Sequence, residues 1–223
     1  MLDRLYLLPI LLFSIIVHEI AHGWMALKLG DPTARDMGRL TLNPIPHIDP
    51  IGSILVPLIA MLSPGNFFIA WAKPVPVNPM YFRNYRRDDI LVSIVGPLSN
   101  IFMALVCTIF YVIFIHLLLL FRETESVAVQ AIYFFINMFA GGITLNIMLA
   151  VFNMIPIPPL DGSHVLAAFL PEEIGERYQQ IGFYGIFLLI FLMSFTPFNT
   201  VFHRIISFLQ LPFDVIIGLL VRQ

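Results

Sequence analysis

Long apolar segments separated by short polar breaks dominate this chain of 223 residues. About 20 consecutive apolar residues suffice to cross the hydrocarbon core of a bilayer, so these segments predict transmembrane helices. The last one contains His203, Arg204, Pro212 and Asp214, which makes it either a poor span or an amphipathic helix. The segments cover residues 5–29, 90–121, 127–152, 181–195 and 198–221.

The region between the first two long segments has a different pattern. Residues 51–61 and 67–72 are apolar but too short to span alone, and a Ser-Pro-Gly-Asn break separates them. We interpret 51–72 as a re-entrant hairpin or strand pair, with one tilted span as the alternative. Residues 39–42 and 73–79 are candidate short strands. The pattern predicts an all-α polytopic membrane protein with about five to six transmembrane segments and this re-entrant hairpin or short strand element.

Composition supports a membrane protein. Hydrophobic residues make up 59% of the chain and charged residues only 12%, against about one quarter in soluble domains. A net charge of −2 without any basic run argues against a nucleic-acid partner and leaves the lipid bilayer as the expected surroundings. Cys107 is the single cysteine, which excludes an internal disulfide and a thiolate zinc site. We expect one membrane domain over 1–223, with a core at 5–165 and C-terminal helices at 178–223.

The distribution of lysine and arginine predicts the orientation. With 51–72 re-entrant and the loop after the first span cytoplasmic, nine of the 12 Lys and Arg residues lie inside. A full crossing of 51–72 would leave five inside against seven outside. The re-entrant arrangement of 51–72 is therefore favoured, and it places position 22 roughly 10 Å below the cytoplasmic surface.

The stretch His18-Glu19-Ile20-Ala21-His22 lies inside the first apolar segment. On a helix, positions 18 and 22 share one face about one turn apart, which suits a single tetrahedral Zn²⁺. Glu19 is then placed to take a proton from a water on the metal. Ionisable groups are costly in such a segment and indicate a functional site. The alternative is a pair of core histidines with Glu19 paired elsewhere.

A catalytic zinc needs a third protein ligand, and Asp161 is the best candidate. It follows a proline-rich stretch that no helix can hold, and such irregular backbone at membrane depth lines protein or a wet cavity. Its alternative role is a helix N-cap. His47 and Asp49 are rival ligands in a polar loop. His116, His164 and His203 lack a partner at ligand spacing and are interpreted as snorkelling or capping groups.

Asn153 lies where the helix before Asp161 breaks. Its side-chain amide is placed to hydrogen-bond a substrate backbone or an oxyanion. The alternative is an ordinary helix C-cap.

Three motifs together resemble the site-2 protease family of intramembrane zinc metalloproteases. They are His18-Glu-x-x-His22, the stretch Gly96-Pro97-Leu98-Ser99-Asn100, and Asn153-x-x-Pro-x-Pro-x-Leu-Asp161-Gly. The stretch 73–79 also resembles the compact prokaryotic members. The resemblance covers roughly residues 10–165, and no stretch here is long or polar enough for a PDZ or CBS domain.

This resemblance implies a set of roles. His18, His22 and Asp161 would bind one Zn²⁺ per chain, Glu19 would be the general base, and Asn153 and Pro159 would position substrate. The implied function is hydrolysis of peptide bonds in transmembrane protein or peptide substrates, as in regulated intramembrane proteolysis. The implied location is a prokaryotic plasma membrane, with the active site nearer the cytoplasm. A metal transporter and a catalytically inactive membrane-binding scaffold are the alternatives.

Overall fold

The computed structural model describes residues 6–50, 52, 72–121 and 127–221, and every structural statement below concerns these residues. Their backbone forms helices joined by turns and short extended stretches, without a strand, so the predicted all-α class is confirmed for this part. The α-helices are α1 Leu8–Leu29, α2 Thr33–Asp36, α4 Tyr85–Leu120, α5 Val127–Asn153, α6 Asp161–Phe169, α7 Glu172–Gln179, α8 Gly185–Phe195 and α9 Phe198–Val221. Single 3-10 turns are η2 Ile45–His47, η4 Pro79–Tyr81 and η5 Gly182–Tyr184.

Four of these helices, α1, α4, α5 and α9, are long and apolar enough to cross a membrane. Helix α8 has 11 residues, and at 1.5 Å per residue it covers roughly half of a 30 Å hydrocarbon core. The prediction of a span at 181–195 is therefore not confirmed, and neither is the total of five to six. The described residues do show the repeated apolar helices of an integral membrane protein.

Helix α4 begins five residues before its predicted start at residue 90 because the chain supplies a cap there. The Asn84 side-chain oxygen accepts a hydrogen bond from Arg87 N–H at 3.2 Å, and Asp88 accepts one from Asn84 N–H at 3.1 Å. Two backbone donors of the first turn are satisfied reciprocally, which lets the helix form through charged residues.

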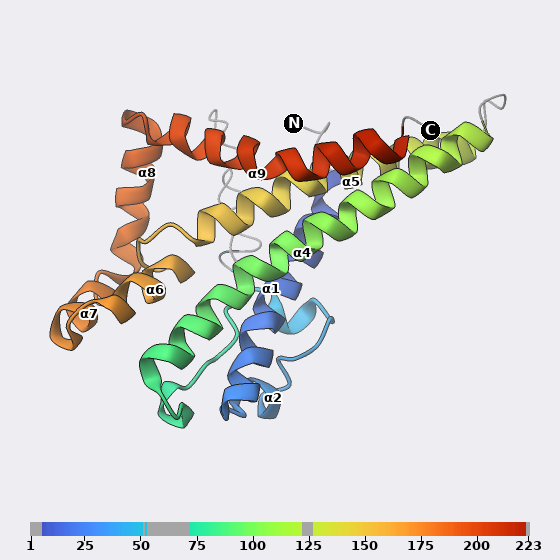
Figure 1. Cartoon of the computed structure of the whole chain (residues 1–223). Helices are drawn as coiled ribbons and strands as arrows, with labels where there is room; N and C mark the ends of the chain where they lie inside the picture. Colours follow the sequence, from blue (N-terminus) through green and yellow to red (C-terminus); the bar gives the residue numbers. More distant parts are fainter. Residues whose placement is uncertain (1–5, 51, 53–71, 122–126, 222–223) are drawn as a thin grey trace.

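Helices α4 and α5 lie side by side and form the largest helix pair (Figure 1). Phe110 stacks on Phe139 with ring centroids 5.1 Å apart, and Phe114 stacks on Phe135 at 4.8 Å. Further along the pair, a Cβ added at Gly142 would lie 2.9 Å from the Cys107 sulfur. The absence of a side chain at Gly142 therefore allows close approach of α5 to α4.

Helix α9 runs across α5 and α4, while α8 connects it to the α6–α7 pair (Figure 1). It continues through Pro212, and one side of it, including Phe202, Ile206 and Phe213, is buried in the shared hydrophobic core. Residues 198–221 thus form a single helix of spanning length.

The short strands predicted at 39–42 and 73–79 are absent from the described residues between α1 and α4. Residues 39–42 are a bent loop, and most of 73–79 is extended but pairs with no strand in the described part of the chain. Pro74 and Pro76 carry no N–H, so the edge of this stretch on which they lie cannot form a regular hydrogen-bonded ladder. The predicted re-entrant hairpin at 51–72 lies outside the described residues, apart from Gly52 and Ala72.

Candidate metal centre

His18 and His22 lie one helical turn apart on the same face of α1. Their ring centroids are 4.6 Å apart with an interplanar angle of 82°, and the two Nε2 atoms are 3.0 Å apart. His18 is buried, and the His22 side chain is 11% exposed. The i, i+4 spacing thus brings two ring nitrogens together inside the protein.

The opposite nitrogen of each ring is bonded to α4. His18 Nδ1 lies 2.7 Å from the Asn100 side-chain oxygen, and His22 Nδ1 lies 2.7 Å from the Val92 carbonyl oxygen. Both partners are acceptors, so each Nδ1 carries the proton and donates it. Each neutral ring then turns a lone pair on Nε2 toward the other, which is the tautomer required of a metal ligand.

Gly96 makes room for the two rings. A Cβ at this position would overlap the His22 ring and would lie 2.7 Å from His18 Cε1. Val92, Gly96 and Asn100 are spaced four residues apart on one face of α4, so one helix face supplies both acceptors and the space between them. Pro97 lacks the N–H that would bond the carbonyl of residue 93, which removes one helix bond next to Val92.

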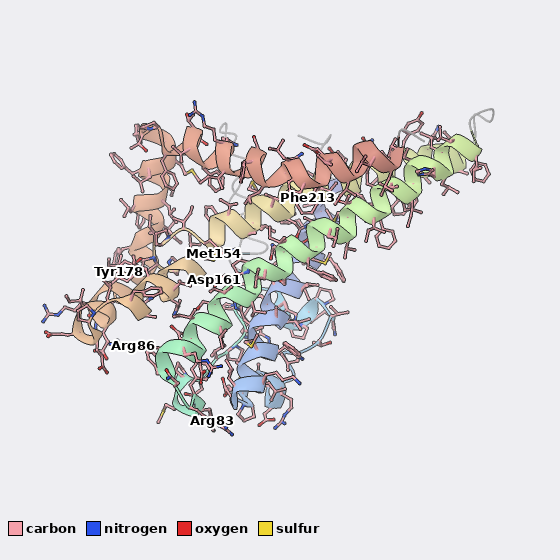
Figure 2. The ribbon with its side chains drawn as sticks, viewed as in Figure 1. Arg83, Arg86, Met154, Asp161, Tyr178 and Phe213 are labelled. Carbon is pink, nitrogen blue, oxygen red and sulfur yellow. The ribbon has the colours of Figure 1, made fainter. Side chains whose placement is uncertain are left out.

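Asp161 is the first residue of α6, and it lies beside the two histidines on the side of α6 that faces α4 (Figure 2). One carboxylate oxygen lies 3.2 Å from His18 Nε2, and the other lies 3.4 Å from His22 Nε2. The turn between α5 and α6 is tight: a Cβ at Gly162 would overlap the Met154 carbonyl and lie 2.8 Å from the Ile155 oxygen. Glycine at 162 therefore allows Asp161 to be carried this close to α1.

The ionisation of Asp161 suits a ligand. Burial alone would raise the pKa of its carboxyl group, but the imidazole nitrogens of His18 and His22 outweigh that effect. They hold the pKa of Asp161 well below its ordinary value. The carboxylate is therefore anionic at neutral pH.

These three side chains fit a zinc ion. Ligand atoms that each lie about 2.05 Å from a tetrahedral ion are about 3.3 Å from one another. The two Nε2 atoms are 3.0 Å apart, and they lie 3.2 and 3.4 Å from different oxygens of Asp161. With one ligand atom taken from each residue, the three atoms lie within 4.8 Å of one another. With each ring proton on Nδ1, the two Nε2 lone pairs and the Asp161 carboxylate would face one another, and a bound cation would balance that arrangement. Within the described residues, this is the group of His, Cys, Asp or Glu side chains that could hold a metal.

Glu19 lies next to the centre but points to a different neighbour. Its Oε2 atom accepts a hydrogen bond of 2.7 Å from Val75 N–H, in the extended segment 73–79. This segment packs on α1, where a Cβ at Gly23 would lie 2.7 Å from both Val75 and Leu40. One carboxylate oxygen of Glu19 is thereby held by the backbone of segment 73–79.

The segment 73–79 is itself anchored to the loop after α1. The buried Asp31 accepts a hydrogen bond from Asn78 N–H at 2.6 Å, and Arg39 donates one to the Lys73 carbonyl at 2.8 Å. Lys73 N–H in turn donates to the His47 carbonyl at 2.9 Å. Asp31, Arg39 and His47 thus hold segment 73–79 in place, and through the Val75 N–H this segment holds Glu19.

The two remaining predicted site residues lie on the chain that leads to Asp161. Asn153 ends α5, and its amide nitrogen donates to the Leu149 carbonyl of its own helix at 3.0 Å. Pro159 is exposed, two residues before Asp161. No hydrogen bond joins either residue to the three clustered side chains within the described part.

The structure does not place the rival ligands in the cluster. His47 is 1% exposed, against the expectation of a wet loop, and its Nε2 donates to the Thr41 carbonyl at 2.9 Å. Asp49 accepts from Gly52 N–H at 2.6 Å. His164 forms an ion pair with Asp89 at 3.2 Å, a partner the sequence did not reveal. The hydrogen bond to Asp89 raises the pKa of His164.

Sequence reasoning gave no role to Asn100, Gly96 and Val75. Asn100 did offer a signal, because an amide side chain in an apolar span is expected to be functional. Gly96 and Val75 lie in stretches that carried the family resemblance, but a glycine in a helix and a valine between prolines also have ordinary explanations, so neither residue was given a role.

Comparisons with known proteins identify the relatives of this chain. Residues 6–193 match the model of "Peptidase family M50". The chain is 37% identical over 195 residues to "Putative zinc metalloprotease YwhC" of Bacillus subtilis, which covers 87% of this chain and 82% of that protein. No solved structure gives a significant match.

Two further relatives carry similar names. "Putative zinc metalloprotease Rip2" of Mycolicibacterium smegmatis is 28% identical over 189 residues, covering 83% of this chain and 65% of that protein. "Putative zinc metalloprotease MJ0611" of Methanocaldococcus jannaschii is 36% identical over 153 residues, covering 68% of this chain and 63% of that protein.

Proposed function

The chain belongs to peptidase family M50 and is a zinc metallopeptidase, and from this premise we propose that it hydrolyses peptide bonds of transmembrane substrates within or next to the bilayer. The observation that carries the proposal is the convergence of His18, His22 and Asp161 on one point between apolar helices. A hydrolase buried among spanning helices meets peptide bonds that soluble proteases cannot reach.

We assign the zinc to Nε2 of His18, Nε2 of His22 and the Asp161 carboxylate. Zinc bound there supplies Lewis-acid polarisation of the scissile carbonyl and lowers the pKa of a coordinated water toward 7. Glu19 acts as general base: it takes the proton of the attacking water and returns it to the leaving amine. The Val75 N–H keeps Glu19 oriented for both transfers.

Substrate positioning is assigned to the segments that border the centre. A transmembrane helix hides its carbonyls in its own hydrogen bonds, so the scissile region must unwind before it can react. The extended segment 73–79 can align such a peptide in an extended form, and Asn153 and Pro159 are proposed to bind it from the Asp161 side. Releasing the Asn153 amide from its own helix would free it to donate to the substrate.

We further propose that residues 1–223 form one multi-pass domain in a prokaryotic plasma membrane, with the centre nearer the cytoplasmic side. The excess of lysine and arginine in the loops after α1 and before α4 supports this orientation. In this arrangement the protease would carry out regulated intramembrane proteolysis.

The test replaces Glu19 by Gln, which keeps the size of the side chain and removes the proton acceptor. Wild type and variant are reconstituted in liposomes with one cleaved single-span substrate, and single-turnover rates and bound zinc are measured. Zinc content should be retained, while turnover should fall by about 10²–10⁴-fold, as expected for loss of a general base.

The matched control is Glu173→Gln, an exposed acid that pairs with Arg177 on α7. Such surface pairs contribute little, so this variant should cleave like wild type. A Glu19→Gln protein that holds zinc and cleaves at the wild-type rate would exclude the proposed mechanism. Zinc movement across the liposome without any cleavage in wild type would support transport instead.

A further inference from the structure

We propose that Asn100 is a positioning residue of the metal centre: its side-chain oxygen fixes the tautomer and orientation of His18 and so sets the zinc affinity. The inference rests on the proposed assignment of His18 as a ligand. It adds a role for a residue of α4 that touches neither the zinc nor the substrate.

The contact is short and fully enclosed. Asn100 is 1% exposed and His18 is 7% exposed, and the oxygen lies 2.7 Å from His18 Nδ1. A buried N–H without an acceptor is unfavourable, because it has lost its hydrogen bond to water and gained none in the protein. The bond to Asn100 therefore selects the tautomer with the proton on Nδ1 and the lone pair on Nε2, on the side of His22 and Asp161.

The two histidines are held in different ways. His22 donates to the backbone carbonyl of Val92, which any residue at position 92 would provide. His18 depends on a side chain, and no other described group accepts from its Nδ1. Position 100 is therefore where a substitution can remove an outer hydrogen bond from a ligand without altering the helix backbone.

The identity of the side chain also matters. Gly96, one turn before Asn100, already leaves the space in which both rings sit. Asn reaches across this space with a neutral acceptor, whereas Leu has the same number and branching of side-chain heavy atoms but no acceptor. Asp keeps an acceptor oxygen in the same position and would form the carboxylate–histidine pair common behind metal-bound imidazoles.

The experiment compares Asn100→Leu, Asn100→Asp and a control in the same helix, all as full-length protein in detergent. The control is Thr108→Val, which removes one fully buried hydrogen bond, from the Thr108 hydroxyl to the Ala104 carbonyl, without touching a histidine. Zinc dissociation constants are measured by competition with a chromophoric chelator. The visible spectrum of each protein saturated with Co²⁺ reports the ligand geometry, and circular dichroism reports folding.

Asn100→Leu should bind zinc about 10–100-fold more weakly, the usual loss when the outer partner of a metal-ligating histidine is removed. Its Co²⁺ spectrum should also change. Asn100→Asp should restore both properties to near the wild-type values, and Thr108→Val should not differ from wild type.

Two results would overturn the proposal. In the first, Asn100→Leu binds zinc and Co²⁺ as wild type does. In the second, Asn100→Asp folds and binds zinc as weakly as Asn100→Leu. Zinc affinity would then depend on the packing of the Asn100 amide and not on its acceptor oxygen. If Asn100→Leu does not fold, the Asn100→Asp comparison decides alone. Failure of the proposed function is separate: wild type would then bind no zinc, or His22→Ala would bind it unchanged.

Discussion

Helices α4 and α9 are both apolar, both long enough to cross a membrane and both interrupted by a proline, yet they serve the protein differently. In α4, Pro97 lies between a glycine and an asparagine that together accommodate the histidines of α1. In α9, Pro212 lies in a helix in which only 6% of the residues of an apolar 18-residue stretch are buried, against 28% in α4.

One polar residue from each helix illustrates a similar contrast. Asn100 is buried and bonded to another helix, whereas in α9 the hydroxyl of Ser207 donates to the carbonyl of His203 in its own helix. A proline or a polar residue in an apolar helix is thus not by itself a sign of chemistry. The sign is a buried polar group whose partner lies on a different helix.

The largest effect expected from this comparison is that of Gly96→Ala. The added methyl group overlaps both imidazole rings, so the ligands must shift, and a displacement of about 1 Å can cost about 10²-fold in rate. Zinc affinity should fall as well. Single-turnover cleavage and chelator competition measure the two quantities.

Gly218→Ala in α9 is the matched control, since a Cβ there meets nothing within 4 Å. Alanine is the better helix former by about 0.5–1 kcal/mol, so this variant should be as active as wild type and slightly more stable. Equal cleavage rates and zinc affinities of the two alanine variants would show that the glycine of α4 has no more influence on the metal centre than the glycine of α9.

A smaller effect is expected from Val75→Pro, which removes the N–H that holds Glu19. A hydrogen bond to a charged group contributes about 1.5–3 kcal/mol, so turnover should fall about 10- to 100-fold while zinc content stays constant. Val75→Ala, which keeps the N–H and loses the side chain, separates the hydrogen bond from packing. A wild-type rate for Val75→Pro would show that Glu19 is oriented by something else.

The smallest effect concerns pH and the ion pair that links α6 to Asp89 of α4. Its hydrogen bond raises the pKa of His164 in the folded protein. The stabilisation is therefore complete below the unfolded pKa of about 6.5 and is lost as pH rises through the folded value.

Melting temperatures of wild type and His164→Gln should accordingly differ most near pH 6 and converge at higher pH. The difference should be at most a few degrees, because the pair is partly exposed. His203→Gln in α9, whose imidazole has no ion pair among the described residues, should show no such trend. A difference for His164→Gln that grew with pH would contradict the assignment.

Local features of the sequence predicted much of the fold and the candidate site. The helical spacing of His18 and His22 and the break before Asp161 are determined within a few residues, and the sequence was sufficient to find them. Helix α4 began earlier than predicted because the cap at Asn84 outweighed the charges that follow it.

Contacts between distant segments could not be predicted. His18 and Asn100 are 82 residues apart, and Glu19 and Val75 are 56 apart. Such pairs are set by how α1, α4 and the loops pack, which no periodicity within one segment encodes. The strand expected at 73–79 does not form with any other described segment, and the Val75 and Asn78 N–H groups bond to side chains of distant residues.

The central claim is that His18, His22 and Asp161 together bind one zinc. Elemental analysis of purified wild type, His22→Ala and Asp161→Ala tests it most directly, with circular dichroism to confirm that each protein is folded. We expect about one zinc per wild-type chain and a marked loss in both variants. Undiminished zinc in either folded variant would contradict it.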